Sequence, residues 1–255
     1  MRASVSKFLI LSLEILVRSY WSLLSTNVGF PGGTAMENYE EFKDDSEKSA
    51  PVRGFLHRAN KTGADCMVLT HGAGANCQTL LLKAVAEAFC ASGVTVLRCD
   101  LLFRQARPHG PPMRGSGERD QEGLRAAVAA MRRESAGRVF LGGHSYGGRQ
   151  ASMLAATAPE LAERLLLLSY PLHPPKRLDQ MRTAHFPSLQ TPALFVSGER
   201  DGFGSTEEIE SALKLIPART ELLMIPGAGH ELITTRNRAE LPGRMVEAFL
   251  KFTQG

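Results

Sequence analysis

Short apolar runs alternate with amphipathic stretches along the chain from residue 66 onward. The apolar runs predict strands at residues 66–71, 94–100, 137–143, 164–171, 192–198 and 220–227. The amphipathic stretches carry apolar residues at helical spacing and predict helices at residues 78–93, 121–134, 145–158, 205–216 and 241–253. Strands that are apolar almost throughout and are separated by helices indicate a parallel sheet covered on both faces. The pattern therefore predicts an α/β fold with a doubly wound, mostly parallel sheet.

A single domain is expected for most of the chain. Its 255 residues fit one α/β domain, and no shift in composition divides the middle of the sequence. Apolar residues make up 43% of the sequence, which is enough for a sizeable core. We therefore predict one domain over residues 41–255, preceded by an N-terminal extension over residues 1–40.

The N-terminal extension resembles a signal peptide only in part. Arg2 and Lys7 precede an apolar run, but Glu14 interrupts that run and no convincing cleavage site follows it. The run is also shorter than the about 20 apolar residues that span a bilayer as a helix. Three interpretations stay open: a degenerate signal or interfacial anchor, a helix packed on the domain, and an extension upstream of a true start at Met36. The acidic stretch after Met36 favours the third.

Charge and cysteine content narrow the class of function. The formal net charge of +4 comes mostly from arginines spread along the chain, without the basic run that would indicate nucleic-acid binding. The cysteines lack CxxC spacing and are interpreted as buried, reduced thiols of a cytoplasmic protein; they are Cys66, Cys77, Cys90 and Cys99. Export or membrane contact is the alternative if the N-terminal segment is retained. The spacing of His, Cys and carboxylate residues also predicts no metal or dissociable cofactor.

Polar clusters follow five of the predicted strands. They are HGAGAN (71–76), DLLFRQ (100–105), GHSYGG (143–148), GERDGFG (198–204) and GAGHE (227–231). In an open α/β sheet, ligands bind beyond the carboxyl ends of the strands. We therefore expect the chemistry of this protein at these clusters.

Ser145 lies in a G-x-S-x-G pattern directly between a predicted strand and a predicted helix. This arrangement is typical of a nucleophile elbow, a sharp turn that exposes the serine hydroxyl. Glycine at Gly143 and Gly147 lets the strand and the helix approach closely. The short pattern also occurs by chance, but its context predicts a true elbow.

A serine hydroxyl needs a base to become a nucleophile at neutral pH, and histidine is the usual one. His230 follows the last strand, and Asp201 lies between Ser145 and His230 in sequence, which gives the chain order Ser, Asp, His. The carboxylate would orient the imidazole and stabilise its protonated form. Glu199 and Glu231 are the competing carboxylates, and Asp201 is preferred because Glu199 lies too near the strand end and Glu231 adjoins the histidine.

Acyl transfer also needs two N–H donors for the oxyanion. The backbone amide of Tyr146, the residue after Ser145, is expected to be one, and the amide of Ala73 in the glycine-rich HGAGAN turn is expected to be the other. Structural roles are predicted for His71, which would hold this turn, and for His144, which would pack behind the elbow.

Together the motifs HGAGAN, GHSYGG, GERDGFG and GAGH, over about residues 66–235, resemble the α/β-hydrolase superfamily. The stretch from Ser169 to Ile209, with DLLFRQ upstream, resembles a narrower branch of small dienelactone-hydrolase-like proteins related to testis-expressed protein 30 and to the hydrolase-like domain of an NSL complex subunit. That resemblance implies the same sheet, the same triad positions and a minimal cap. Dienelactone hydrolases carry cysteine as nucleophile, so serine at position 145 favours ester hydrolysis over that lactone chemistry.

The expected function is a serine hydrolase that cleaves small or short-chain carboxylic esters without a cofactor. The segment 172–190 is too short for a folded cap, so a shallow, open pocket is expected. Four side chains near the strand ends are candidates to line it: Phe103, Arg104, Tyr170 and Phe203. Arg104 and Arg107 would attract an acidic substrate or lie in a solvated loop. The alternatives are a non-catalytic binding protein with the hydrolase fold, and an acyltransferase or peptidase with the same triad.

Overall fold

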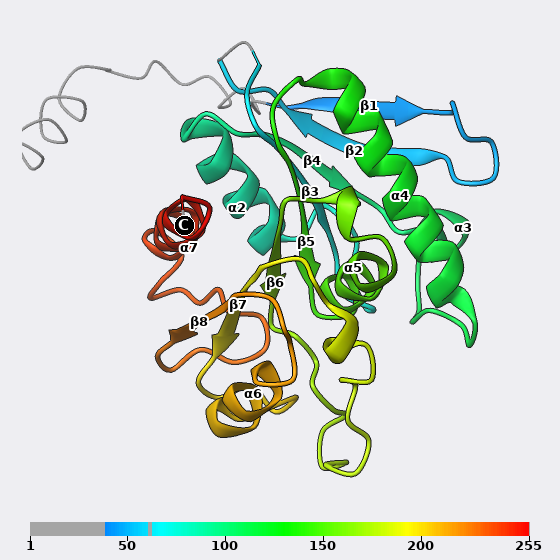
Figure 1. The fold of residues 1–255 in the computed structure, drawn as a ribbon. Coiled ribbons are helices and arrows are strands. Elements are labelled where there is room, and N and C mark those ends of the chain that lie inside the picture. The colour runs from blue at the N-terminus through cyan, green and yellow to red at the C-terminus, as the bar shows by residue number, and fades with distance from the viewer. Residues whose placement is uncertain (1–38, 61–62, 255) are drawn as a thin grey trace, which may run out of the picture. The chain divides into compact units, whose positions relative to one another are not determined.

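An eight-stranded mixed sheet runs through the computed structural model, which describes residues 39–60 and 63–254 (Figure 1). The strand order is β1-β2-β4-β3-β5-β6-β7-β8. The strands are β1 (Glu40–Asp44), β2 (Val52–His57), β3 (Cys66–Thr70), β4 (Thr95–Cys99), β5 (Val139–His144), β6 (Arg164–Leu168), β7 (Ala193–Gly198) and β8 (Thr220–Ile225). All neighbours from β4 to β8 pair in parallel, whereas β2 pairs antiparallel with both β1 and β4. The predicted mostly parallel sheet is confirmed.

Helices cover both faces of this sheet (Figure 1). One face packs against α2 (Leu80–Ala91) and α7 (Leu241–Phe252), and the other against α4 (Ser116–Glu134), α5 (Tyr146–Thr157) and α6 (Thr206–Leu213). A strand points successive side chains to opposite faces, so Met67 packs with the α2 side and Val68 with the α4 side. The two buried clusters explain why strands such as β3 are buried at every position.

The structure contains elements that the hydrophobic pattern did not predict. These are the strands β1 and β2 and the short helix α3 (Leu102–Ala106), and α4 begins at Ser116, five residues before the predicted start at 121. β1 is an edge strand with sequence EEFKD and mostly exposed side chains, so it lacks an apolar run. The predicted extension over residues 1–40 lies outside the described residues except for its last two.

The segment 172–190 carries no folded cap, as its length predicts. The one regular element that the structure describes within it is a short 3₁₀ turn at Phe186–Ser188. No helix within residues 39–60 and 63–254 has both the length and the apolar character needed to cross a membrane.

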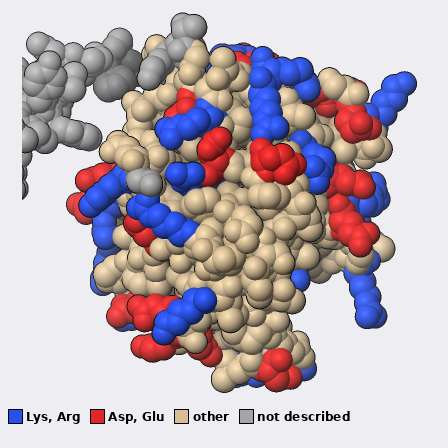
Figure 2. Space-filling view, in the orientation of Figure 1, with Lys and Arg blue, Asp and Glu red and all other residues tan. Residues whose placement is uncertain are grey.

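The surface in Figure 2 carries charges of both signs. Lys and Arg side chains alternate with Asp and Glu along the margins of this face, and uncharged residues occupy its centre. The positive net charge is therefore not gathered into one basic patch on the face shown.

The cysteines are free thiols. Cys66, Cys77 and Cys99 are buried, and burial raises the pKa of Cys66 and of Cys99 to about 12, which keeps both protonated and unreactive. Cys90 differs from the prediction because it is only half-buried, and its Sγ–H donates to the Arg58 carbonyl at 3.1 Å.

Candidate active site

Ser145 joins β5 to α5 without a loop, because β5 ends at His144 and α5 begins at Tyr146. Its backbone has φ 52° and ψ −116°, a strained conformation for a residue with a side chain. The N–H of Ser145 donates to the Leu168 carbonyl of β6 at 2.8 Å, which holds the turn against the sheet. The sharp turn predicted from the sequence is present.

Glycines permit this turn because strand and helix backbones touch there. A Cβ on Gly143 would lie 2.9 Å from the Gly147 carbonyl carbon and from the Thr70 oxygen. A Cβ on Gly147 would lie 2.5 Å from the His71 oxygen. Any larger residue at either position would separate α5 from the sheet.

The structure brings Ser145, Asp201 and His230 together at the carboxyl edge of the sheet. The Ser145 hydroxyl donates to His230 Nε2 at 2.8 Å, and His230 Nδ1–H donates to Asp201 Oδ2 at 2.8 Å and Oδ1 at 3.0 Å. The three residues follow β5, β7 and β8, which are parallel, so their carboxyl ends lie along one edge. A chain of hydrogen bonds thus runs from hydroxyl to imidazole to carboxylate.

The Asp201 carboxylate is fixed by its surroundings. Its side chain is 2% exposed, and Asp201 Oδ1 also accepts the Phe203 N–H at 2.9 Å. The Phe203 ring lies against the His230 imidazole with 4.2 Å between ring centroids. Glu199, the competing carboxylate, instead accepts the Gly227 N–H at 2.8 Å, and Glu231 is exposed.

Two further histidines hold the backbone near Ser145. His71 Nδ1–H donates to the Gly72 carbonyl at 2.8 Å, and His71 Nε2 accepts the Leu101 N–H at 3.2 Å. Burial lowers the pKa of His71, which agrees with this neutral tautomer. His144 Nε2–H donates to the His230 carbonyl at 2.9 Å and fixes the loop that carries the imidazole. Both side chains thus bond to backbone groups, which fits the structural roles predicted for them.

The residues predicted as oxyanion donors lie beside Ser145. Ala73 and Tyr146 line the same cavity as Ser145, which has a volume of about 650 Å³. Arg104 holds the turn that carries Ala73: its guanidinium donates to the carbonyls of Ala73 at 3.1 Å and Ala75 at 2.7 Å.

Of the four predicted pocket side chains, only Phe203 lines this cavity. Arg104 is 5% exposed and binds carbonyls instead of facing the cavity, because α3 turns it toward the HGAGAN turn. Tyr170 is 2% exposed, packs against Phe186 and Phe195, and donates its hydroxyl to the Arg182 carbonyl at 2.6 Å. Both predictions were wrong because a residue that follows a strand can turn toward a neighbouring backbone segment, as Arg104 does, or into the core, as Tyr170 does.

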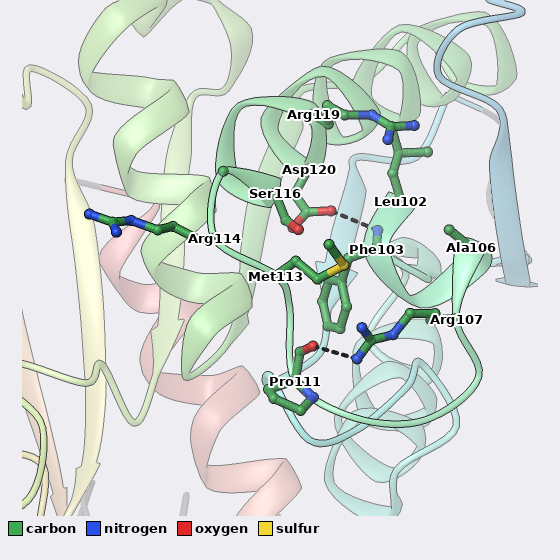
Figure 3. A pocket seen from close by; sticks show the side chains of 11 residues that line it. Leu102, Phe103, Ala106, Arg107, Pro111, Met113, Arg114, Ser116, Arg119 and Asp120 are labelled. Carbon is green, nitrogen blue, oxygen red and sulfur yellow. Dashed lines mark hydrogen bonds between the residues drawn. The ribbon is translucent and has the colours of Figure 1, made fainter.

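Phe103 lies in a neighbouring cavity of about 270 Å³ (Figure 3). Its ring meets the Tyr146 ring edge-on with 5.7 Å between centroids, and its N–H donates to Asp120 Oδ1 at 2.9 Å. Arg107 lies at the rim of the same cavity and donates to the Pro111 carbonyl at 3.2 Å. Phe103 therefore supports Tyr146 from behind and does not face Ser145.

Sequence reasoning missed most of the residues that line the cavity beside Ser145. Basic and sulfur-containing side chains are prominent among them: Arg114, Arg149, Arg182, Met113 and Met153. Arg149 carried a usable signal, since it follows Ser145 by four residues and so lies one helical turn along α5 on the same face.

Comparison with known proteins shows the family of this chain. A family model described as "Alpha/beta hydrolase domain" matches residues 63–250. The chain belongs to the α/β-hydrolase family. A curated protein of Haemophilus influenzae named "Putative esterase/lipase" is 27% identical over 136 residues, which cover 51% of this chain and 45% of that protein. The match thus spans less than half the length of this curated relative.

Solved structures share the α/β-hydrolase fold over most of the chain. A dienelactone hydrolase from Anabaena variabilis has a TM-score of 0.66 at 20% identity and covers 84% of this chain and 98% of its own. An α/β serine hydrolase without a lid from Xanthomonas campestris has a TM-score of 0.64 at 18% identity and covers 89% and 98%. At these identities the likeness supports the fold, and the narrower resemblance drawn from the sequence stays a prediction.

Proposed function

We propose that the protein is a serine hydrolase of small carboxylic esters, with Ser145 as nucleophile, His230 as base and Asp201 as the residue that orients the base. The observation that carries the proposal is the hydrogen-bond chain from the Ser145 hydroxyl through His230 to Asp201 beside a cavity of about 650 Å³. Family membership and the esterase/lipase name of the curated relative support hydrolysis as the reaction class.

The first half of the reaction forms an acyl-enzyme. Ser145 Oγ attacks the ester carbonyl carbon while its proton passes to His230 Nε2, and Asp201 holds the Nδ1–H of the resulting imidazolium. The backbone N–H groups of Ala73 and Tyr146 stabilise the oxyanion. Collapse of the intermediate breaks the bond to the alcohol oxygen, which takes the proton from Nε2.

Water completes the cycle. It attacks the acyl carbonyl and gives one proton to His230 Nε2, and the second tetrahedral intermediate releases the carboxylic acid while Ser145 Oγ regains its proton. The absence of a folded cap over the described segment 172–190 fits small or short-chain acyl groups. The free cysteines fit a reducing compartment, and we therefore propose a cytoplasmic location.

Labelling with a fluorophosphonate probe tests the nucleophile. Wild-type protein is expected to be labelled, and Ser145→Ala protein is not. An unlabelled wild-type protein would instead support a non-catalytic binding role for the fold. A series of 4-nitrophenyl esters then tests the acyl group, with acetate to butyrate expected to give the highest kcat/KM and a preference for long chains contradicting the proposal.

The same residues would serve acyl transfer to an acceptor other than water, or peptide hydrolysis. Product analysis separates these reactions. Release of free acid from a short-chain ester, undiminished by added alcohol or amine, supports hydrolysis, and acyl transfer to the added acceptor contradicts it.

A further inference from the structure

Three arginines line the cavity beside Ser145. Arg114 lies in the loop before α4, Arg149 lies on α5, and Arg182 lies in the segment after β6. In Figure 3 the side chain of Arg114 points away from the other residues of the smaller cavity. Glu118 is the acidic residue among the described residues that line the larger cavity. Basic side chains therefore outnumber acidic ones where a substrate would lie.

Arg149 is the arginine most closely tied to the nucleophile. The backbone N–H of Arg149 donates to the Ser145 carbonyl at 3.0 Å. In its side chain, Nε is buried without a hydrogen-bond partner in the part of the chain that the structure describes. The positive charge of Arg149 acts to lower the pKa of three neighbouring groups, which are Arg182, Tyr170 and His185. Burial, with the Arg149 charge added, lowers the pKa of His185 to about 4, so this neighbour is neutral at pH 7 and adds no positive charge of its own.

Arg182 is positioned by the backbone of its segment. The backbone N–H of Arg182 donates to the Leu172 carbonyl at 2.8 Å, and the backbone carbonyl of Arg182 accepts the Tyr170 hydroxyl at 2.6 Å. Burial and then the nearby Arg149 charge lower the pKa of the Arg182 guanidinium. Neither arginine forms an ion pair with a carboxylate within residues 39–60 and 63–254.

Two partly buried like charges without a counter-ion are unfavourable, and a bound anion removes that cost. The planar guanidinium is also the side chain best suited to hold a carboxylate or phosphate through paired hydrogen bonds. We propose that Arg149 and Arg182, with Arg114 at the mouth of the cavity, bind an anionic group of the substrate, a carboxylate or a phosphate, while the ester lies at Ser145. This inference rests on the proposed function and names the substrate class for that site.

Matched esters test the preference for an anion. Mono(4-nitrophenyl) glutarate and 4-nitrophenyl pentanoate have the same chain length and differ in a terminal carboxylate. 4-Acetoxybenzoate and its methyl ester make the same comparison on the alcohol side. With Ser145→Ala protein as the background for spontaneous hydrolysis, the anionic member of at least one pair is expected to have a kcat/KM about tenfold or more above its neutral partner.

Variants assign that preference to the two arginines. Arg149→Met and Arg182→Met are each expected to lower the anionic-to-neutral ratio of kcat/KM by about tenfold. Arg149→Lys keeps the charge but loses the planar guanidinium that donates paired hydrogen bonds, so the ratio should fall less than in Arg149→Met protein. Arg244→Met is the matched control, because this exposed arginine lies on α7 at the opposite face of the sheet, and the ratio is expected to stay as in wild type. An unchanged ratio in both Arg149→Met and Arg182→Met proteins overturns the inference.

Binding to Ser145→Ala protein separates this inference from the proposed function. Titration calorimetry with monomethyl glutarate and dimethyl glutarate compares the two chemistries without turnover, and inorganic phosphate tests whether phosphate is the better ligand. Tighter binding of the anions supports the site even if wild-type protein neither hydrolyses esters nor reacts with a fluorophosphonate. Hydrolysis through Ser145 with no preference for the anion in either measurement overturns the anionic site and leaves the hydrolase proposal intact.

Discussion

The Tyr146 hydroxyl donates to Asp120 Oδ2 at 2.7 Å, and this contact ties the turn at Ser145 to α4. Asp120 has no exposed surface, and its Oδ1 accepts the Phe103 N–H from α3 (Figure 3). Burial raises the pKa of Asp120, while its two hydrogen bonds favour the carboxylate. One carboxylate therefore fixes both the residue after Ser145 and the ring that packs on it.

Asp120→Ala is expected to destabilise the protein, because it leaves the partly buried Tyr146 hydroxyl and the buried Phe103 N–H without their acceptor. Each such group costs about 1–3 kcal/mol, so the free energy of unfolding should fall by about 2 kcal/mol or more. Asp120→Asn keeps one acceptor and should lose less. Urea unfolding followed by circular dichroism measures the difference, and equal stability of Asp120→Ala and wild type contradicts the role given to this carboxylate.

Arg104 supports the turn that carries Ala73, and its loss should reduce both stability and turnover. Its guanidinium donates to the carbonyls of Ala73, Ala75, Arg107 and Gly110. Arg104→Met leaves these acceptors unpaired and frees the turn. If the Ala73 amide is the oxyanion donor that we propose, kcat for a short-chain ester is expected to fall by about tenfold or more because that donor is misplaced. Arg104→Lys should not restore kcat, since a single ammonium cannot reach carbonyls on both sides. Steady-state kinetics of both variants with 4-nitrophenyl acetate checks this.

Asp201→Asn is expected to lower kcat by about 10³–10⁴-fold, because the neutral amide cannot hold the His230 tautomer or stabilise its protonated form. Glu199→Gln is the matched control, since this neighbouring carboxylate accepts the Gly227 N–H and does not touch His230. Its kcat should stay within about threefold of wild type, because substitutions of exposed residues usually have small effects. A large loss in Glu199→Gln protein, with Asp201→Asn protein still active, would reverse the assignment of the carboxylate.

The convergence of Ser145, Asp201 and His230 was predictable because parallel strands bring their carboxyl ends to one edge, so position along each strand fixes position in space. The lining of the cavity was not, because it depends on side-chain direction and on packing between distant segments. Tyr170 follows β6 by two residues and turns into the core, where its hydroxyl finds a carbonyl. Arg182 reaches the cavity from an irregular segment with no periodicity to read.

Two glycine-to-alanine changes should have opposite effects on stability. A Cβ on Gly147 would lie 2.5 Å from the His71 oxygen, so Gly147→Ala forces α5 from the sheet and should lower the free energy of unfolding by about 1–3 kcal/mol. A Cβ on Gly243 in α7 would meet no atom within 4 Å. Gly243→Ala should therefore raise the free energy of unfolding by about 0.5–1 kcal/mol through helix propensity. Urea denaturation of the pair checks both signs, and equal effects would contradict the close approach at the elbow.

Acid should destabilise the protein through His57, which is 1% exposed and accepts the Arg98 Nε–H at its Nε2, at 2.8 Å. Burial, then the charges of Arg98 and Lys83, lowers the pKa of His57 from 6.5 to about 4. Between pH 6.5 and about 4, the unfolded chain therefore holds a proton on His57 that the folded protein does not hold. The contribution of His57 to the free energy of unfolding is fully present above pH 6.5 and falls by about 3 kcal/mol as the pH drops to about 4. Urea unfolding at several pH values measures this slope. His57→Gln should reduce this slope while keeping an acceptor for Arg98, and the part that remains belongs to groups such as His185, whose pKa is also lowered to about 4. The exposed His109→Gln control should leave the slope as in wild type. An unchanged slope in His57→Gln protein would show that other groups carry the acid sensitivity.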